Sequence, residues 1–344
     1  MGTKLADIMK AEVISLSDLK DRVIAIDAFN TIYAFLASIR QPDGTPLLDR
    51  QGRITSHLSG LFYRNLNLLE SGISPVFVFD GEAPKLKAAE QERRREIRDA
   101  AYEEWETAKE EGRIEDARKA GQASSRLTKP MIEESKRLLE ALGIPVVQAP
   151  SEGEALAAQM TRANIAWASA SQDNDSLLYN CPRMIRNLSI SGRRRVSRSR
   201  AQMTIHPELI DLDMNLRLLG ITREQLIDIA ILVGTDYNDG VTGVGPKTAL
   251  KLIKTHNDIE GVEKEKGLQY DFPYLEIREI FLNPPKSELV EPKWSDPDMD
   301  KLTRILCAEH DFSTNRVEKS LERLEKALEE IRGSTQQSSL TDFF

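Results

Sequence analysis

The chain has 344 residues, of which 40% are hydrophobic and 30% are charged, and its formal net charge is −8. No apolar run approaches the roughly 18 residues of a membrane span, and the N-terminus lacks a signal-peptide pattern, so we expect a cytoplasmic protein. The negative charge argues against nucleic acid as a partner only if the carboxylates are free, because bound metal ions would neutralise part of it.

Two apolar runs in the first quarter of the chain end on an aspartate. Residues 21–27 and 75–80 are predicted to be buried strands that stop at Asp27 and Asp80, and residues 30–39 between them have helical periodicity. A strand, a helix and a second strand of this kind predict a βαβ unit in a parallel sheet, with both aspartates at one edge. A single aspartate at a strand end is usually a turn former, so these two alone decide nothing.

The composition of the chain changes over residues 85–126, where acidic and basic residues alternate densely and apolar residues are rare. Their composition favours helix, yet they offer too little apolar surface for a core layer. They are either a solvated helical insertion or a helical cover over a site. Lys87 and Arg94 are seven residues apart, which places them on one helix face, where cations could meet a phosphate.

Four further carboxylates come in two close pairs. Glu152 and Glu154 follow a short apolar run and open an Ala-rich helix, and Asp173 and Asp175 follow a strand predicted over 165–170. The first pair also fits a helix cap, and the second fits Asx turns. Acidic pairs at the carboxyl ends of strands nevertheless indicate a crevice that binds hard cations such as Mg²⁺ or Mn²⁺.

The remaining candidates lie in the second half of the chain. A predicted helix over 223–233 leads to Asp236, and the glycine-rich stretch 240–245 then runs into another helix with Lys247 at its start. A glycine hairpin between helices presents backbone amides to phosphate, although glycine turns between helices are also common. The basic run 192–200 fits either a solvated hairpin or a phosphate contact.

The last twelve residues are expected to leave the globular part of the chain. Residues 333–339 are polar and predict a flexible linker, and the chain then closes on two phenylalanines. Leu340 and Phe343 are three apart, so one helical turn would present them together to a groove on a partner. A frayed end is the alternative.

These motifs, in this order and spacing, closely resemble the flap endonuclease 1 family over nearly the whole chain. The resemblance is carried by the segments 27–30, 78–82, 149–155, 171–176 and 234–238 and by the hairpin 243–247. It implies an α/β fold with a central, mostly parallel sheet flanked by helices, a helical arch insertion at about 85–126 and a helix–two-turn–helix element at about 226–255. It also implies a single nuclease domain over 1–332 and a tail over 333–344. The two phenylalanines that end the chain are similar to the ending of archaeal members.

The resemblance also implies roles for individual residues. Lys87 and Arg94 match the basic pair that engages the scissile phosphate. The positions that match the acids holding two divalent ions are Asp27, Asp80, Glu152, Glu154, Asp173, Asp175 and Asp236. The positions that match DNA contacts are Gly2, Tyr33, Arg40, Arg64, Gly243, Gly245 and Lys247. The positions that match a sliding-clamp-binding box are Gln337, Leu340, Phe343 and Phe344.

The implied activity is hydrolysis of a phosphodiester at the junction of a 5′ flap, with two Mg²⁺ ions or with Mn²⁺ as a substitute. A K⁺ ion is implied at the glycine hairpin, and the implied partners are branched DNA and a sliding clamp, with the chain a monomer. Relatives often carry an aromatic residue or Met where this chain has Asn174, and some carry Ser where it has Gly240. We expect the first departure to affect packing alone, and the second weakens the case for K⁺ at the hairpin. The alternatives are a 5′–3′ exonuclease of the same superfamily, a non-catalytic junction binder or clamp adaptor, and a small-molecule phosphatase.

Overall fold

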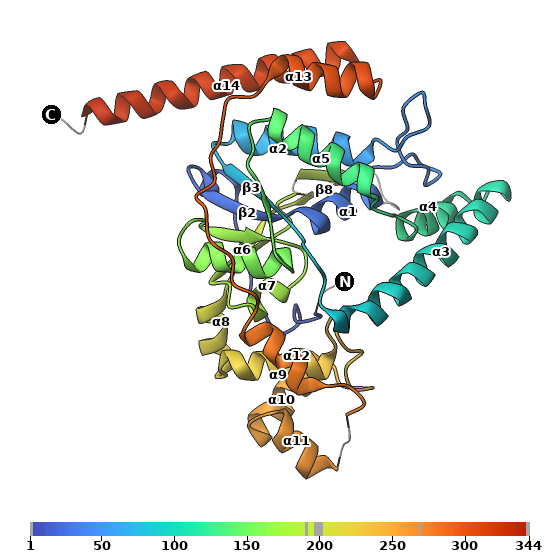
Figure 1. Ribbon diagram of the computed structural model, residues 1–344, viewed down its shortest axis with the longest axis vertical. Helices are drawn as coiled ribbons and strands as arrows, with labels where there is room; N and C mark the ends of the chain where they lie inside the picture. The colour runs from blue at the N-terminus through green and yellow to red at the C-terminus, as the bar shows by residue number, and fades with distance from the viewer. Residues whose placement is uncertain (1–2, 190–191, 196–201, 268–269, 342–344) are drawn as a thin grey trace.

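The computed structural model describes residues 3–189, 192–195, 202–267 and 270–341, and Figure 1 shows how they are arranged. A seven-stranded sheet has the strand order β1-β9-β6-β5-β2-β3-β4. Its strands are β1 (Glu12–Val13), β2 (Val23–Asp27), β3 (Ser74–Phe79), β4 (Val146–Gln148), β5 (Ala168–Ala170), β6 (Arg183–Arg186) and β9 (Glu208–Asp211). The strands from β6 to β4 are parallel, and β9 is antiparallel to β6 and β1. The predicted mostly parallel sheet is confirmed.

Successive residues of the central strands face two different cores. In β2, Ile24 and Ile26 are buried in one apolar cluster and Ala25 in another, and β3 repeats the alternation with Phe77 and Val78. Side chains of a strand point alternately to the two faces, so continuous apolar runs require cover on both. The first core contains residues of α1 (Ala28–Ser38), α2 (Ser56–Glu70), α5 (Lys129–Ala141), α13 (Met299–Thr303) and the π-helix η3 (Arg304–Glu309). The second contains residues of α6 (Gly153–Arg162).

The other helices gather with the N-terminal segment in a further apolar cluster, below the sheet in Figure 1. Leu5 and Met9 of that segment are buried there, and the short helix η1 (Leu16–Leu19) follows. The helices of this part are α7 (Asp175–Leu178), α8 (Leu212–Leu219), α9 (Arg223–Val233), α10 (Pro246–His256), α11 (Ile259–Lys266) and α12 (Tyr274–Leu282). The cluster therefore packs the start of the chain against its second half.

The predicted insertion forms two helices that project to one side of the molecule (Figure 1). The short helix η2 (Lys85–Lys87) leads into α3 (Ala88–Glu110), which packs against α4 (Ile114–Ala123). Ala108 is the one buried residue of α3, in line with the predicted lack of core surface. At Gly44, where φ is +81°, an added Cβ would lie 2.6 Å from the carbonyl oxygen of Ala117. The tip of the loop after α1 therefore lies directly on α4.

The C-terminal segment differs from the prediction. The sequence predicts a flexible linker from Gly333, whereas α14 (Thr314–Thr341) continues through it. Extending a long helix costs no new nucleation, and a single glycine costs only about 1 kcal/mol, so residues 334–341 continue the helix. Neither α14 nor another helix in the described ranges combines the length and apolar character that a membrane crossing needs.

Residues 192–195, at the start of the basic run, belong to a two-stranded antiparallel ribbon. β7 (Gly192–Arg195) pairs with β8 (Gln202–Ile205). The arginines at 198 and 200 lie outside the described residues.

Candidate nuclease site

The carboxyl ends of four neighbouring parallel strands lead to acidic residues. In spatial order, β5 leads to Asp173, β2 ends at Asp27, β3 leads to Asp80, and β4 leads to Glu152. Parallel strands end at the same edge of a sheet, so the four acids lie at one edge. Asp236 reaches this edge from the loop after α9. The predicted convergence of acids from several strands is therefore observed.

Two cations from the arch contact these acids. The Nζ atom of Lys87 lies 2.7 Å from Oε2 of Glu152 and 3.2 Å from Oδ2 of Asp236. Arg94 forms an ion pair with Asp236, and its Nε donates to Oε1 of Glu90 at 2.7 Å. Both cations thus extend from the start of the arch toward the acids, as their seven-residue spacing predicts.

Short polar side chains hold the acids at the β2 and β5 end of the site. The side-chain amide of Asn30 donates to Oδ2 of Asp173 at 2.9 Å, and its backbone N–H donates to Oδ1 of Asp27 at 3.0 Å. The hydroxyl of Ser171 donates to Oε1 of Glu154 at 2.8 Å. These bonds fix one oxygen of each carboxylate and thereby its orientation.

Asp80 and Asp175 are held by backbone amides. The N–H of Gly153, at the start of α6, donates to Oδ1 of Asp80 at 2.7 Å. The N–H and the hydroxyl of Thr3 donate to Oδ1 of Asp175 at 2.8 and 2.7 Å. The N-terminal segment therefore enters the site. Gly2, which the resemblance places there, lies outside the described residues.

Burial and mutual repulsion make several of the acids hard to ionise. Burial, together with the charges of Asp80 and Asp173, raises the pKa of Asp27 well above its usual range. Burial and the charges of Asp175, Asp27 and Asp173 do the same to the pKa of Glu154. These neighbours must lie close to one another for such effects, so the carboxylates behave as one electrostatic cluster.

The same causes act more moderately on two further acids. Burial and the charge of Glu152 raise the pKa of Asp80 to about 6, and burial and the charges of Asp236 and Asp173 raise the pKa of Asp175 to about 6. Such repulsion disappears when a divalent cation lies among the acids.

Asp236 shows the opposite behaviour. Burial would raise its pKa, but the charges of Lys87 and Arg94 outweigh burial and lower it. The charges of Glu152 and Asp236 raise the pKa of Lys87 against the effect of its own burial. The arch cations therefore supply part of the positive charge that this acidic edge requires.

The donor set suits a hard divalent ion, because it consists of carboxylate oxygens in a partly buried, strongly acidic pocket. Within the described ranges, however, no group of three or more His, Cys, Asp or Glu side chains stands in an arrangement that could hold an ion. The side chain of Lys87 contacts both Glu152 and Asp236, and that of Arg94 contacts Asp236.

Three predicted DNA contacts lie on α1, just after it and on α2. Tyr33 is half-buried on α1, and Arg64 is half-buried on α2, where burial lowers the pKa of its guanidinium. Arg40 bonds within the protein: its Nη1 donates to the carbonyl of Gly44 at 2.6 Å and its Nη2 to the hydroxyl of Ser125 at 2.9 Å. Arg40 therefore ties the loop after α1 to the end of the arch.

The predicted glycine hairpin lies between α9 and α10. Gly243, Gly245 and Lys247 are exposed, and Gly245 caps the N-terminus of α10. Gly240 has φ +75°, and an added Cβ would lie 2.4 Å from the carbonyl carbon of Val233. The departure from Ser at this position thus matches a backbone that has no room for a side chain.

Two of the four predicted clamp-binding residues belong to the part of the chain that the structure describes. Gln337 and Leu340 belong to the last turns of α14. Phe343 and Phe344 lie outside the described residues.

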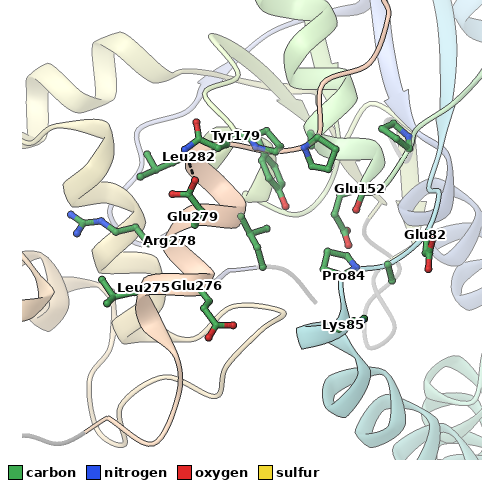
Figure 2. Close-up of a pocket in the computed structure, with 18 residues that line it drawn as sticks. Glu82, Pro84, Lys85, Glu152, Tyr179, Leu275, Glu276, Arg278, Glu279 and Leu282 are labelled. Atoms are coloured by element: carbon green, nitrogen blue, oxygen red, sulfur yellow. Dashed lines mark hydrogen bonds between the residues drawn. The ribbon is translucent and has the colours of Figure 1, made fainter.

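A pocket with a cavity volume of about 870 Å³ adjoins the site at Glu152. Figure 2 shows Glu82, Pro84 and Lys85 on one side of it and the side chains of α12 on the other. Its walls are largely apolar, and Glu152 is the residue that it shares with the acidic edge. This pocket was not predictable from the sequence, because its walls come from segments far apart in the chain.

Four polar residues of the site were not predicted to act there. Thr3, Asn30 and Ser171 each hold an acid, and the side-chain amide of Asn174 donates to the carbonyl of Thr3 at 2.9 Å. The prediction that Asn174 affects packing alone is therefore wrong, because the residue bonds to the N-terminal segment. Asn30, Ser171 and Asn174 stand inside the recognised motifs, and this position is the signal that could have identified them.

Comparisons with known proteins agree with this geometry. The XPG N-terminal domain matches residues 1–101, and the XPG I-region matches residues 143–236. Together these two regions contain all of the candidate acids.

Curated and solved relatives cover almost the whole chain. Flap endonuclease 1 of Hyperthermus butylicus is 52% identical over 337 residues, which are 96% of this chain and 96% of the relative. The structure of flap endonuclease-1 from Methanococcus jannaschii has 38% identity and a TM-score of 0.70, covering 96% of this chain and 99% of that one. The catalytic core of Rad2 in complex with DNA substrate has 25% identity and a TM-score of 0.71, covering 94% and 100%.

Proposed function

This chain belongs to the flap endonuclease 1 family, and we propose that it is the structure-specific nuclease that removes 5′ flaps from DNA during replication and repair. The reaction is hydrolysis of one phosphodiester at the flap junction, and it leaves a 5′ phosphate and a 3′ hydroxyl. A 5′–3′ exonuclease activity accompanies it. Membership of the family supports the substrate class, and the geometry of the site supports the choice of residues.

The observation that carries the proposal is the contact of Lys87 with Glu152 and Asp236. In this contact, cations that can bind a phosphate lie next to oxygen donors that can bind divalent ions. A phosphodiester that entered between them would receive Lys87 and Arg94 on its non-bridging oxygens, where negative charge develops during the reaction. A non-catalytic junction binder would not require carboxylates clustered beside these cations.

The family depends on divalent metal, and we propose that two Mg²⁺ ions, with Mn²⁺ as a substitute, bind at the acidic edge. The residues that would hold them are Asp27, Asp80, Glu152, Glu154, Asp173, Asp175 and Asp236. Two such ions supply an activated water and stabilise the leaving oxygen in phosphodiester hydrolysis. Asn30, Ser171 and Gly153 would keep the carboxylates oriented, and Lys87 and Arg94 would bind the phosphate.

The glycine hairpin supports a proposal for duplex binding. At Gly245, φ is −90° and an added Cβ would have no atom within 4 Å, so the protein's own packing does not require glycine there. Glycine at an exposed helix N-terminus lets a phosphate approach the amides closely. We assign Gly243, Gly245 and Lys247 to the duplex backbone, with a K⁺ ion at the hairpin.

The residues at the start of the arch and beside it are proposed to hold the DNA near the junction. Tyr33 would stack on a base, and Arg64 would contact the backbone. A guanidinium has five N–H donors, so the bonds of Arg40 to Gly44 and Ser125 do not exhaust its capacity for a phosphate. Gly2 would place the N-terminal amine beside the site.

The tail is proposed to bind a sliding clamp. Gln337, Leu340, Phe343 and Phe344 would form the contact, with the apolar side chains in a groove of the clamp. The nuclease itself is proposed to act as a monomer. Gel filtration and a pull-down with the clamp, using the full chain and a chain that ends at residue 336, would test both statements.

The deciding experiment is cleavage of a labelled double-flap duplex, compared with single-stranded and blunt duplex DNA, in Mg²⁺ and in EDTA. A single product cut at the junction, dependent on metal and on the flap, is expected. Trimming from a 5′ end without flap preference would favour the exonuclease of the same superfamily. Tight binding without any cut would leave the junction binder.

One variant tests the site itself. Asp173→Ala is expected to bind the flap duplex as the native protein does and to lose cleavage, because it removes an oxygen donor and leaves the hairpin intact. Normal turnover by this variant at saturating Mg²⁺ would overturn the metal-site assignment.

A further inference from the structure

Residues 3–10 are held by hydrogen bonds at both ends, to the nuclease site through Thr3 and to α8 through Lys10. Thr3 is buried, with 2% of its surface exposed, and its two donors bind the same oxygen of Asp175. Seven residues later, the N–H and C=O of Lys10 bond reciprocally with the side chain of Asn215. Leu5 and Met9 between them are buried in the core around α9. The segment is therefore held in place independently of Thr3.

Asn174 completes this arrangement. Its side-chain amide donates to the carbonyl of Thr3 at 2.9 Å, and the N–H of Leu5 donates to the same carbonyl at 2.9 Å. Asn174 is 5% exposed and precedes Asp175 in the chain. Asn174 thus binds the carbonyl of Thr3, while the N–H and the hydroxyl of Thr3 bind Asp175.

We propose that Thr3 is a positioning residue of the nuclease site, which fixes one oxygen of Asp175 so that the other faces a divalent ion. The inference rests on the proposed function. An unrestrained aspartate side chain would sample several rotamers, and only some of them direct an oxygen into the site. Two donors on Oδ1 select one orientation, as partners of metal-binding carboxylates do in other proteins. Asn174 acts one step further out, by holding Thr3.

The test compares Thr3→Val, Thr3→Ser and Asn174→Ala in the full chain, without an N-terminal tag. Valine has nearly the shape of threonine and keeps the backbone N–H but lacks the hydroxyl, whereas serine keeps the hydroxyl. Mn²⁺ binding to the DNA-free protein is measured by electron paramagnetic resonance. Flap cleavage is measured in single turnover as a function of Mg²⁺ concentration and of DNA concentration.

Thr3→Val is expected to weaken Mn²⁺ binding by about tenfold, at the lower end of the effect of such partners, because the backbone N–H remains. The Mg²⁺ concentration needed for half-maximal cleavage is expected to rise similarly, while the KM for DNA stays within about twofold. Thr3→Ser is expected to restore both values, and Asn174→Ala to give a smaller change than Thr3→Val. Melting temperatures in EDTA confirm that each variant is folded.

Equal Mn²⁺ affinity of Thr3→Val and the native protein would overturn the inference, provided that the native protein binds Mn²⁺ and cuts flaps. Failure of Thr3→Ser to restore affinity would also overturn it, because a loss shared by both variants would reflect packing. If the native protein itself neither binds Mn²⁺ nor cuts flaps, the proposed function falls together with this inference.

Discussion

Nζ of Lys87 lies 2.7 Å from Oε2 of Glu152, in an ion pair between the start of the arch and the start of α6. Both side chains are nearly buried, with 13% and 12% of their surface exposed, so the pair is more strongly coupled than a surface salt bridge. Because the lysine comes from the arch and the glutamate from the sheet edge, this contact connects the position of the arch to the charge of the site.

Replacing Lys87 with Met should separate catalysis from binding. The variant keeps the length of the side chain and removes the charge, so the rate of flap cleavage is expected to fall about 10²- to 10³-fold, as for the loss of one positioned donor. Single-turnover cleavage and a fluorescence measurement of DNA affinity check this. The matched control is Lys85→Met, since Lys85 is exposed and precedes Lys87 by two residues. Equal loss of DNA affinity and rate would instead make Lys87 a binding residue.

Without metal, the acids of the site should make the protein less stable at neutral pH. The pKa values of Asp80 and Asp175 are raised to about 6, above the unfolded value of 3.8, so the folded state binds more protons than the unfolded state between these values. Stability in EDTA is therefore expected to rise as the pH falls from 7.5 to 5.5, with a gain of about 5 °C in melting temperature.

Two comparisons isolate that effect. The double variant Asp80→Asn, Asp175→Asn should show a smaller gain, because amides do not titrate and no longer raise the pKa values of Asp27 and Glu154. Saturating Mg²⁺ should abolish the gain in the native protein. Differential scanning calorimetry at several pH values gives both comparisons. A double variant with the same pH dependence as the native protein would show that other groups cause it.

A buried network away from the site should contribute substantially to stability. Nε2 of His57 lies 3.2 Å from Oε2 of Glu134, and Nδ1 of His310 lies 3.3 Å from Oδ2 of Asp49. Both histidines are buried. Glu134→Ala leaves His57 without its partner, so the free energy of unfolding is expected to fall by about 2 kcal/mol at pH 7.

The neighbouring glutamate is the control for that substitution. The side chain of Glu133 is 70% exposed and pairs with Lys136 at 3.6 Å, so Glu133→Ala should change stability by less than about 0.5 kcal/mol. Denaturant unfolding of both variants measures the difference. Equal effects would show that the network adds no more than a surface pair.

The strands and acids of this fold were predictable because each leaves a local pattern in the sequence. Continuous apolar runs predicted β2 and β3, and the acid that terminates each run predicted its place at the sheet edge. The helix predicted over 223–233 agrees with α9. Such features depend on residues close together in the chain.

What the sequence did not reveal depends on residues far apart. The bond between Thr3 and Asp175 joins residues 172 positions apart, and the bond between Arg40 and Ser125 joins residues 85 apart. A threonine near the start of a chain carries no periodicity that would assign it a partner. The helical end of α14 was missed for another reason. The polar composition of residues 333–339 predicted a linker, and the prediction did not allow for the ease with which an existing helix extends.

Close packing at Gly81 should make that position sensitive to a single methyl group. An added Cβ would lie 2.2 Å from the carbonyl oxygen of Ala149 and 2.6 Å from the carbonyl carbon of Pro150. Gly81→Ala must therefore push apart the segments that carry Asp80 and Glu152. The free energy of unfolding is expected to fall by about 2 kcal/mol, as for an overpacked site, and flap cleavage is expected to fall with it.

Gly245→Ala provides the contrast, because an added Cβ there has no atom within 4 Å. This variant should unfold as the native protein does while binding duplex DNA less tightly, since the methyl group would stand between the hairpin amides and a phosphate. Denaturant unfolding and DNA affinity, measured for both variants, separate the two roles of glycine. If Gly81→Ala unfolded at the same denaturant concentration as the native protein, the methyl group would have been accommodated. The two acid-bearing segments would then not be closely packed at Gly81.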